Sequence, residues 1–540
     1  MAAFPPEIIA EYTSSGDWTD ETIAQAVARQ AAAKPAAPAL LADDATLSWR
    51  EYDELSTRLA AALVGLGLAP GDHLAVYLSN SAATHVSYLA AQKAGLVTVG
   101  LGPRSGASEI RHVLAKTKAR TILTRDIHRG QTTAGIADRF GLDHHVVLDV
   151  ARQSVSVDGS PVDLPAVDAA RSSVAGRGLG PNDAFFINST SGTTGLPKCV
   201  IQTMNTRKYF SPLAAAAAGL GPDEVVASVV PAPYGFGQWT GHTMPPTYGY
   251  PLVVTEEFDA ERTLELVQQH RVTVLAAVTS QFIMMLNSPL MDEVDLSSLK
   301  ALFTGGEKVP ARRAAEFEDR TGCAVLQFYG SNEAGPISVT SVTDEREQRL
   351  GTAGRPIPGM RLRLFDTDGT DVTGRGGPGQ VAARGPGLTP GYYDDPAANE
   401  LLLRPDGWML AGDIATLDEQ GYLRITGRAA DFIIRGGNNI SVLVVEEAVG
   451  GCPKVKQVAV VSSPDEVLGE RVCAYVVTRD GSELTLDELR KSLADQDVSK
   501  QLWPERLVTL PEMPLSAGGK ADKAFLRADA AKRFGPATGG

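Results

Sequence analysis

A polar loop between two apolar segments is the feature that most constrains this chain. Residues 189–198 are Ser-Thr-Ser-Gly-Thr-Thr-Gly-Leu-Pro-Lys. The apolar runs 184–187 and 200–201 flank this loop, and each predicts a buried strand. Glycines let backbone N–H groups approach an anion closely, hydroxyls add uncharged donors, and Lys198 supplies a positive charge. The sequence therefore predicts a loop that cradles a polyphosphate.

This loop is not a Walker A motif. That motif requires Gly-Lys followed by Ser or Thr, whereas Pro197 precedes Lys198 and Cys199 follows it here. The alternative is a solvated Ser/Gly/Thr linker. Because linkers are not usually placed between two buried strands, we favour the phosphate interpretation.

The charge balance argues against two classes of partner. The 540 residues include 50 Lys and Arg against 64 Asp and Glu, which gives a net charge of −14. This acidity disfavours nucleic acid and anionic membrane as partners. No uncharged apolar run reaches membrane-spanning length, and the N-terminus lacks the basic start and apolar core of a signal peptide.

Cysteines and histidines indicate neither disulfides nor a zinc site. The four cysteines are far apart and form no CxxC pair, and the eight histidines show no HExxH spacing. We expect reduced thiols in a cytoplasmic protein. Among the histidines, only His242 lies close to a segment that is assigned to a binding pocket below.

Strands that alternate with helices predict an α/β sheet of mainly parallel strands in the first 350 residues. Several strands end in Gly-rich or aromatic loops, at 231–237, 304–307 and 329–335, where open α/β sheets bind ligands. Residues 153–180 are rich in Ser, Gly, Pro and Asp and predict a surface connection. The predicted strands are residues 73–78, 98–99, 121–123, 144–150, 184–187, 225–230, 252–254, 272–278, 301–303 and 324–328, and the predicted helices include 20–33, 53–66 and 84–94.

The pattern changes after residue 351. Short strands at 361–365 and 379–383, with Gly/Pro turns, indicate an antiparallel β region. The last hundred residues predict a compact α+β unit, in which helix 486–494 begins after Thr485 with Glu488 three positions on. We expect a large N-terminal domain over 1–427, a hinge at 428–431 and a small C-terminal domain over 432–540.

The 189–198 loop resembles the phosphate-binding loop of the adenylate-forming (AMP-binding) superfamily, which includes acyl-CoA synthetases, adenylation domains and luciferases. Residues 329–333, Tyr-Gly-Ser-Asn-Glu, resemble that family's Tyr-Gly-x-Thr-Glu motif. Asn332 stands where the family carries threonine. A carboxylate that faces a triphosphate needs a divalent ion between them, so the resemblance implies that Glu333 binds Mg²⁺.

Further motifs follow in the family's order, and the resemblance covers most of the chain. Residues 305–307, Gly-Gly-Glu, resemble the segment against which adenine stacks, and Asp413 matches the aspartate that binds the ribose diol. Arg428 matches an arginine that contacts ribose or phosphate. These matches imply the AMP-binding fold, with a large α/β domain that includes a β-barrel-like part and a small mobile α+β domain.

The C-terminal part carries three more matches. Asp431 corresponds to the family's hinge, and Gly436 and Gly437 belong to a loop that resembles the one used in thioester formation. The family usually has Pro and Glu where this chain has Val442 and Val444. Lys520, in a Gly-rich segment over 514–523, resembles the catalytic lysine of adenylation.

The resemblance implies a carboxylate–CoA ligase that uses ATP, Mg²⁺ and CoA to convert a carboxylic acid to acyl-AMP and then to a thioester. The implied catalytic residues are Lys520, Glu333 and Thr194. The implied nucleotide- and cofactor-binding residues are Thr190, Ser191, Gly192, Thr193, Thr194, Gly195, Lys198, Gly305, Gly306, Glu307, Tyr329, Gly330, Ser331, Asn332, Asp413, Arg428, Gly436, Gly437 and Lys520.

The acid pocket is implied to include residues 234–236. None of Tyr234, Gly235 and Phe236 is acidic, which argues against an amino acid because amino-acid enzymes use an aspartate here. Gly235 stands where aryl-acid enzymes of siderophore assembly place an asparagine. With further aromatic residues, including Trp239 and Phe282, we expect an aromatic, alicyclic or short branched acid. The implied pocket residues are Tyr234, Gly235, Phe236, Gln238, Gly305 and Gly330.

Two alternatives remain open from the sequence. A stand-alone adenylating enzyme would load the acyl group onto the phosphopantetheine of a carrier protein and would share every ATP motif. A non-enzymatic ATP-binding protein is disfavoured because Lys520, Glu333 and Asp413 are all present. The sequence leaves the oligomeric state undecided, with a homodimer as one option.

Overall fold

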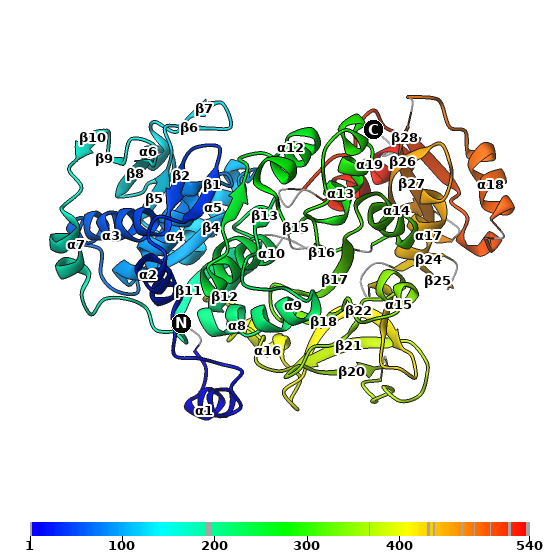
Figure 1. The fold of residues 1–540 in the computed structure, drawn as a ribbon. Helices are drawn as coiled ribbons and strands as arrows, with labels where there is room; N and C mark the ends of the chain where they lie inside the picture. Colours follow the sequence, from blue (N-terminus) through cyan, green and yellow to red (C-terminus); the bar gives the residue numbers. More distant parts are fainter. Residues whose placement is uncertain are drawn as a thin grey trace. The chain divides into compact units, whose positions relative to one another are not determined.

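The computed structural model divides into two compact units, residues 1–362 with 383–409, and residues 363–382 with 410–540 (Figure 1). The predicted boundary at 428–431 falls within the second unit, and residues 429–431 lie outside the described residues, so that boundary stays a prediction. Within the described residues, no helix is long and apolar enough to cross a membrane. The structure describes residues 3–189, 197–307, 309–366, 368–428, 432–435, 438–465, 468–479, 481–496, 498–516 and 520–535.

The first unit contains an eight-stranded sheet with the strand order β10-β9-β8-β5-β3-β4-β11-β12. Its central strands pair in parallel, as predicted, whereas β12 is an antiparallel edge strand. The strands are β3 (His73–Tyr77), β4 (Val97–Leu101), β5 (Thr121–Thr124), β8 (His144–Asp149), β9 (Ser154–Val157), β10 (Ser160–Val162), β11 (Ala184–Ser189) and β12 (Cys199–Thr203). The helices along this part of the chain are α3 (Trp49–Gly65), α4 (Ala82–Ala94), α5 (Ala107–Thr117), α6 (Ile136–Phe140) and α7 (Val167–Val174), and β6 (Ile127–His128) pairs with β7 (Gln131–Thr132).

Two sequence expectations in this region were wrong. Residues 153–180 are not only a surface connection, because they form β9, β10 and α7, and the buried side chains of Val155 and Ala170 anchor them. Short strands with several polar residues lack the periodicity that reveals longer elements. Helix α3 begins at Trp49 rather than residue 53, because Ser48 caps it and Glu51 bonds back to the Ser48 backbone.

A nine-stranded sheet forms the rest of the first unit, in the order β19-β18-β17-β16-β15-β13-β14-β1-β2. Its strands are β1 (Pro38–Ala42), β2 (Thr46–Ser48), β13 (Val226–Ser228), β14 (Leu252–Val254), β15 (Val274–Ala276), β16 (Ala301–Gly305), β17 (Ala324–Ser331), β18 (Gly335–Val339) and β19 (Arg355–Pro356). The remaining helices of the unit are α1 (Pro6–Ser14), α2 (Ile23–Ala33), α8 (Met204–Lys208), α9 (Ser211–Ala217), α10 (Gly235–Gly237), the π-helix η1 (Gln238–Thr243), α11 (Met244–Tyr248), α12 (Ala260–His270), α13 (Thr279–Leu286), the 3₁₀ helix η2 (Pro289–Asp292), α14 (Ala311–Thr321), α15 (Arg346–Gly351) and α16 (Pro396–Leu402).

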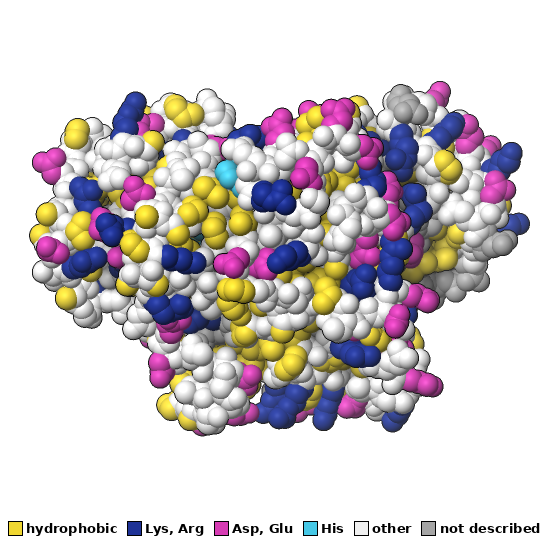
Figure 2. Space-filling model, viewed as in Figure 1, with side chains coloured by type: hydrophobic (Ala, Val, Ile, Leu, Met, Phe, Trp, Pro, Cys, Tyr) yellow, Lys and Arg dark blue, Asp and Glu magenta, His cyan; other side chains and the backbone are white. Residues whose placement is uncertain are grey.

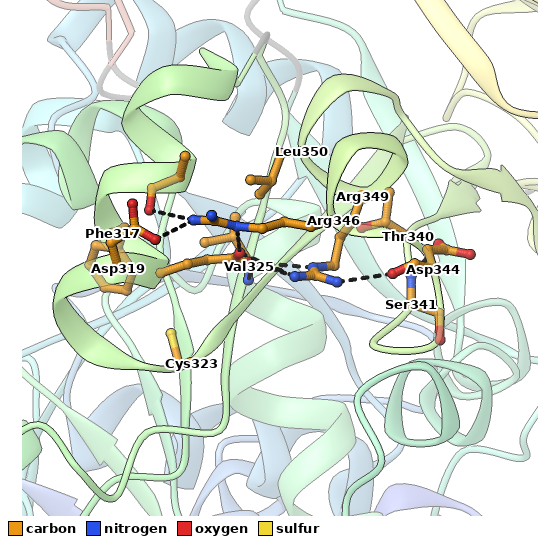
Figure 3. A network of polar contacts seen from close by, with 12 residues as sticks. Phe317, Asp319, Cys323, Val325, Thr340, Ser341, Asp344, Arg346, Arg349 and Leu350 are labelled. Atoms are coloured by element: carbon orange, nitrogen blue, oxygen red, sulfur yellow. Dashed lines mark hydrogen bonds and ion pairs between the residues drawn. The ribbon is translucent and has the colours of Figure 1, made fainter.

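A polar network fixes strand β17 near its start (Figure 3). The buried carboxylate of Glu318, on α14, accepts hydrogen bonds from Arg346 and Arg349 on α15 and from the backbone N–H of Val325. Two residues after Val325 on β17, the Gln327 side-chain amide donates to the Leu350 carbonyl oxygen at 3.0 Å. Buried polar groups that are fully hydrogen-bonded rigidify their surroundings. The network therefore holds the strand whose far end carries residues 329–333.

The second unit holds most of a four-stranded sheet and all of a five-stranded one. The four-stranded sheet has the strand order β20-β21-β22-β23. In the five-stranded sheet, four strands have the order β25-β24-β27-β26, and the fifth strand, β28, pairs in parallel with β27. Helix α18 begins after Thr485 with a reciprocal Glu488 contact, as predicted. The elements are β20 (Arg361–Phe365), β21 (Gly379–Arg384), β22 (Met409–Leu417), β23 (Leu423–Arg428), β24 (Phe432–Arg435), β25 (Asn438–Ser441), α17 (Val442–Gly450), β26 (Val455–Asp465), β27 (Gly469–Thr478), α18 (Leu486–Asp495), the 3₁₀ helix η3 (Lys500–Leu502), β28 (Arg506–Thr509) and α19 (Lys523–Phe534).

Charged side chains are interspersed on the face shown in Figure 2, where basic and acidic groups lie among each other. The four cysteines are buried and unpaired, as predicted. Burial raises the pKa of the Cys199 thiol to about 11 and that of Cys323 to about 12. These thiols are therefore protonated at neutral pH.

Candidate functional site

Three predicted site segments follow strands that end at one edge of the nine-stranded sheet. Strands β13, β15, β16 and β17 run in parallel, so the segments after β13, β16 and β17 emerge on the same side. Tyr329, Gly330 and Ser331, expected in a loop, are the last residues of β17 and pair with β18. The turn at 332–334 follows, and the Ser331 hydroxyl accepts hydrogen bonds from the backbone N–H groups of Glu333 and Ala334, both at 3.2 Å.

Two of the predicted glycines are required by the sheet itself. A Cβ at Gly305 would overlap the carbonyl oxygen of Phe328, and one at Gly330 would overlap that of Gly335. Gly306 has a φ of +81°, which side chains rarely adopt. Beside it, Glu307 accepts a hydrogen bond from the backbone N–H of Ser280 at 3.1 Å. The contact of this segment with adenine stays a prediction.

Tyr392 joins two residues that the sequence had assigned to separate motifs. Its hydroxyl donates to Glu333 Oε1 at 3.0 Å, and the Lys198 ammonium lies 4.7 Å from the centre of its ring. Tyr392 reaches this position because residues 389–393 run along β12, where the Ile201 N–H donates to the Gly391 carbonyl. Burial and the neighbouring Glu333 charge raise the pKa of Tyr392, so its hydroxyl remains a donor. Sequence reasoning missed Tyr392, although a Pro-Gly-Tyr-Tyr run marks it.

The surroundings of Glu333 fit a magnesium ion. The carboxylate is half-buried, and within the part of the chain that the structure describes no hydrogen bond engages Oε2. No cluster of three or more His, Cys, Asp or Glu side chains that could form a closed metal site is found among the described residues. Mg²⁺ in nucleotide sites is commonly held by one or two carboxylates together with substrate phosphates. Glu333 supplies such a carboxylate.

The predicted pocket segment is held in place by asparagine side chains. The Asn80 amide donates to the Val230 carbonyl at 2.9 Å and accepts from the Ala232 N–H at 2.7 Å. Asn188, on β11, donates to the Pro233 carbonyl at 2.5 Å. Asn80 follows β3 and Asn188 lies on β11, so the eight-stranded sheet holds the segment that contains Tyr234, whose hydroxyl is buried beside Gly102. Burial raises the pKa of Tyr234.

Gln238 directly follows α10, and its backbone N–H donates to the Tyr234 carbonyl oxygen at 2.8 Å, while its contact with the acid stays a prediction. Gln238 is fully buried in η1, where its amide donates to the Thr243 hydroxyl at 3.1 Å. Trp239 stacks on Phe303 with ring centres 5.9 Å apart, so it belongs to the core. The remaining nearby residues are also internal: Phe282 packs against Phe317, and His242 is fully buried 2.8 Å from the Gln92 amide nitrogen.

Asn332 connects the end of β17 to the pocket segment. Its side-chain oxygen accepts the backbone N–H of Gly235 at 3.0 Å. Its carbonyl oxygen accepts hydrogen bonds from the Gln202 amide at 2.9 Å and from the Arg207 guanidinium at 2.5 Å. Arg207 is only 2% exposed, and desolvation lowers its pKa to about 10, against the opposing effect of the Glu333 charge. Neither Gln202 nor Arg207 is part of a sequence motif or periodic pattern that would have marked it.

In the second unit, two predicted nucleotide contacts occupy opposite positions in neighbouring strands. Asp413 on β22 pairs in register with Arg428 on β23, and Asp413 is buried. Lys520 is exposed on a turn closed by a bridge between Leu515 and Ala521, immediately before α19. The predicted residues that lie outside the described residues are Thr190, Ser191, Gly192, Thr193, Thr194, Gly195, Asp431, Gly436 and Gly437, together with the Arg428 side chain.

Comparison with known families identifies this arrangement. The model of the AMP-binding enzyme family matches residues 27–393, and the model of the AMP-binding enzyme C-terminal domain matches residues 444–520. The chain belongs to the AMP-binding enzyme family. The resemblance inferred from the 189–198 loop and residues 329–333 is therefore confirmed.

Relatives of this AMP-binding enzyme match it over nearly its whole length. It is 32% identical to the 2-hydroxy-7-methoxy-5-methyl-1-naphthoate–CoA ligase of Streptomyces carzinostaticus, over 98% of this chain and 97% of that protein. It is 31% identical to the salicyl-AMP ligase/salicyl-S-ArCP synthetase of Mycobacterium tuberculosis, over 99% and 95%. Among solved structures, ATP-bound MatB from Rhodopseudomonas palustris matches with a TM-score of 0.80 and 25% identity, over 95% and 99%. The predicted adenylate-forming fold is confirmed.

Proposed function

We propose that this AMP-binding enzyme is a carboxylate–CoA ligase. It activates a carboxylic acid with ATP, releases pyrophosphate, and transfers the acyl group from acyl-AMP to the thiol of CoA. The observation that carries this proposal is the contact of Glu333 with Tyr392, which lies under the Lys198 ammonium at the end of the Ser/Thr/Gly loop. A carboxylate and a cation joined in this way suit a metal-bound polyphosphate. The similarity to ATP-bound MatB supports ATP as the nucleotide.

In the first step, the residues of the first unit hold and orient the reactants. The loop hydroxyls, with Thr194 among them, and Lys198 bind the phosphates, and Tyr392 fixes one oxygen of Glu333, whose carboxylate would hold Mg²⁺. When bound, Mg²⁺ neutralises phosphate charge. A carboxylate oxygen of the acid attacks the α-phosphorus, and the bond to the pyrophosphate oxygen breaks. Catalysis of such a transfer is mainly positioning and electrostatic stabilisation.

The second unit contributes the remaining groups in this proposal. Asp413 accepts hydrogen bonds from both ribose hydroxyls, and Arg428, its partner in register, contacts ribose or phosphate. Lys520 brings its ammonium to the acid and the α-phosphate. In the second step the CoA thiolate attacks the acyl carbon and AMP leaves. The C-terminal part turns about Asp431 between the steps and presents Gly436 and Gly437, a hinge-type movement.

The acid is proposed to be aromatic, alicyclic or short and branched. Residues 234–236 carry no acidic side chain that could pair with an α-amino group. Phe236, in α10, is partly exposed and packs on Trp239 with ring centres 5.9 Å apart, so it offers an apolar surface. The naphthoate–CoA ligase relative supports a ring acid.

A carrier protein is the alternative thiol donor. The observation in its favour is the 31% identity to a salicyl-AMP ligase/salicyl-S-ArCP synthetase over 99% of this chain. Both reactions share the acyl-AMP step, so they differ only in the acceptor of the acyl group.

The test is pyrophosphate release from MgATP over a panel of carboxylic acids, with and without CoA, with Glu333→Gln as the control variant. We expect one group of ring or branched acids to release pyrophosphate, and an acyl-CoA thioester to form only when CoA is present. Acyl-AMP that accumulates without reacting with CoA would favour the carrier-protein alternative. Equal release in the absence of any acid, or full activity of Glu333→Gln, would contradict the proposed function.

A further inference from the structure

Asn332 makes a contact that its counterpart in the family's Tyr-Gly-x-Thr-Glu motif is too short to copy. Its Oδ1 lies 3.0 Å from the backbone nitrogen of Gly235. Because a backbone N–H can only donate, the atom that faces it must be the amide oxygen, and the NH₂ group is turned away from Gly235. A threonine hydroxyl is one bond closer to the backbone. The Asn332 side chain, which is longer than that of threonine, therefore links the turn at 332–334 to the pocket segment at 234–236.

A side chain at position 235 would displace the Asn332 carboxamide. A Cβ there would overlap Asn332 Oδ1 and lie 3.5 Å from its Cγ. Gly235 is buried, and its φ is not in the left-handed region, so backbone conformation does not require glycine. The requirement comes from the Asn332 carboxamide, which occupies the space into which a residue at 235 would project.

The backbone of Asn332 is held from the other side. Gln202 on β12 and Arg207 on α8 both donate to its carbonyl oxygen. Arg207 is buried and packed, so its guanidinium is a rigid support rather than a solvated charge. Strand β12 and helix α8 thereby fix the main chain of Asn332, while its side chain fixes the segment that follows β13.

We propose that Asn332 is a positioning residue that sets acid specificity by clamping residues 234–236 at Gly235. The carboxamide takes the place of a pocket side chain at position 235 and keeps this part of the pocket narrow and fixed. Acids that fit this narrow part of the pocket are preferred. Loss of the Asn332–Gly235 hydrogen bond would allow acids with bulkier rings to bind. This inference rests on the proposed function, because it concerns which acid that same site accepts.

A double-mutant cycle tests the clamp. The full-length variants Gly235→Ala, Asn332→Ala and the double variant are compared by ATP–pyrophosphate exchange with acetate, isobutyrate, benzoate, cinnamate and 1-naphthoate. We expect Asn332→Ala to raise the acid KM about 3–10-fold, as for loss of one hydrogen bond, and to narrow the differences between acids. Because the added Cβ would push the Asn332 carboxamide aside, Gly235→Ala should raise the acid KM by about the same 3–10-fold alone, but by less than about 2-fold in the Asn332→Ala background.

Gly237→Ala is the matched control. A Cβ at Gly237 would also overlap a neighbour, but that neighbour is the carbonyl oxygen of Pro231 rather than Asn332. Its effect should therefore be the same in both backgrounds. If Gly235→Ala does not fold, hydrogen exchange in Asn332→Ala provides the second measurement, and we expect the Gly235 amide to lose protection.

The outcomes separate the two proposals. Absence of exchange with every acid in the wild-type protein would overturn the proposed function, and this inference with it. Wild-type exchange combined with additive effects of Gly235→Ala and Asn332→Ala would overturn the clamp alone. The clamp would also be overturned if Asn332→Ala changed only the KM for ATP, or if the Gly235 amide stayed protected from hydrogen exchange in this variant.

Discussion

Side chains are held differently around Glu333 in the first unit and around Lys520 in the second. Glu333 is bonded to the buried Tyr392, and Gly305 and Gly330 are packed so closely that no Cβ could be added. Lys520, by contrast, is exposed on a turn before α19. Packing fixes the geometry of the first group of residues, whereas a solvent-exposed ammonium is not held by close packing. We infer that the first unit holds its ligand-binding groups in fixed positions, and that the second unit must bring the Lys520 ammonium to the reactants.

The sharpest test of this contrast is Lys520→Ala. An ammonium that meets developing charge in a water-poor site contributes far more than it would in water, and loss of one such contact typically lowers kcat by about 10²–10³. We expect acyl-AMP formation to fall by this factor while the melting temperature stays unchanged. Pyrophosphate release and thioester formation from pre-made acyl-AMP are measured on the same variant, and the second should largely survive.

Lys532→Ala is the control for this experiment, because Lys532 is also exposed and lies in the last turn of α19. It should leave both half-reactions intact. Equal losses of Lys520→Ala in the two half-reactions would contradict a cation used in only one state of the enzyme. Full adenylation activity would remove Lys520 from the mechanism.

Asp413 tests whether the second unit also binds nucleotide. Asp413→Asn keeps the size of the side chain and one carbonyl oxygen but removes the charge. Loss of about one hydrogen bond to a charged acceptor, roughly 1.5–3 kcal/mol, predicts a fall of about 10–10² in kcat/KM for ATP. Steady-state kinetics with ATP and with 2′-deoxy-ATP measure the effect. We expect wild type to discriminate between the two nucleotides and the variant to discriminate less; equal discrimination would contradict the ribose assignment.

Much of this architecture could be predicted because the signals were local. The alternation of strands and helices gave the parallel sheets, and the Thr485–Glu488 pair marked the start of α18. Motif strings such as 329–333 gave the family. These predictions succeed because a strand, a cap or a loop is encoded in neighbouring residues.

Contacts between distant segments could not be predicted in this way. Tyr392 lies beside Glu333 only because residues 389–393 pair with β12, and Arg207 reaches Asn332 from a helix 125 residues earlier. The same limit applies beside the pocket segment, because Trp239 follows it directly and yet is packed in the core. Register and packing, rather than residue type, decide which side chains meet at the site.

Gly330→Ala tests whether the ends of the strands in the first unit are closely packed. Its Cβ would overlap the Gly335 carbonyl oxygen across the β17–β18 pair, so the backbone must shift. Overpacking of this kind costs roughly 1–3 kcal/mol. We expect a lower midpoint of unfolding in urea. Gly322→Ala, at a glycine with open space but a φ of +74°, separates backbone strain from collision. Unchanged stability of Gly330→Ala would show that the strand ends are not rigidly packed.

Tyr392→Phe makes the smallest expected change and asks whether the held geometry of Glu333 matters for binding. The substitution removes only the hydroxyl that donates to Oε1 and keeps the ring under Lys198. Because Glu333 is half-buried, water can replace the lost donor, so the cost is about 0.5–1.5 kcal/mol. The KM for Mg²⁺ at fixed ATP should rise about 2–10-fold, while the KM for the acid stays constant. If the acid KM rises instead, Tyr392 supports the pocket segment rather than the metal side. If neither constant changes, Glu333 keeps its position without the tyrosine, and the strand turn alone is sufficient to preorganise it.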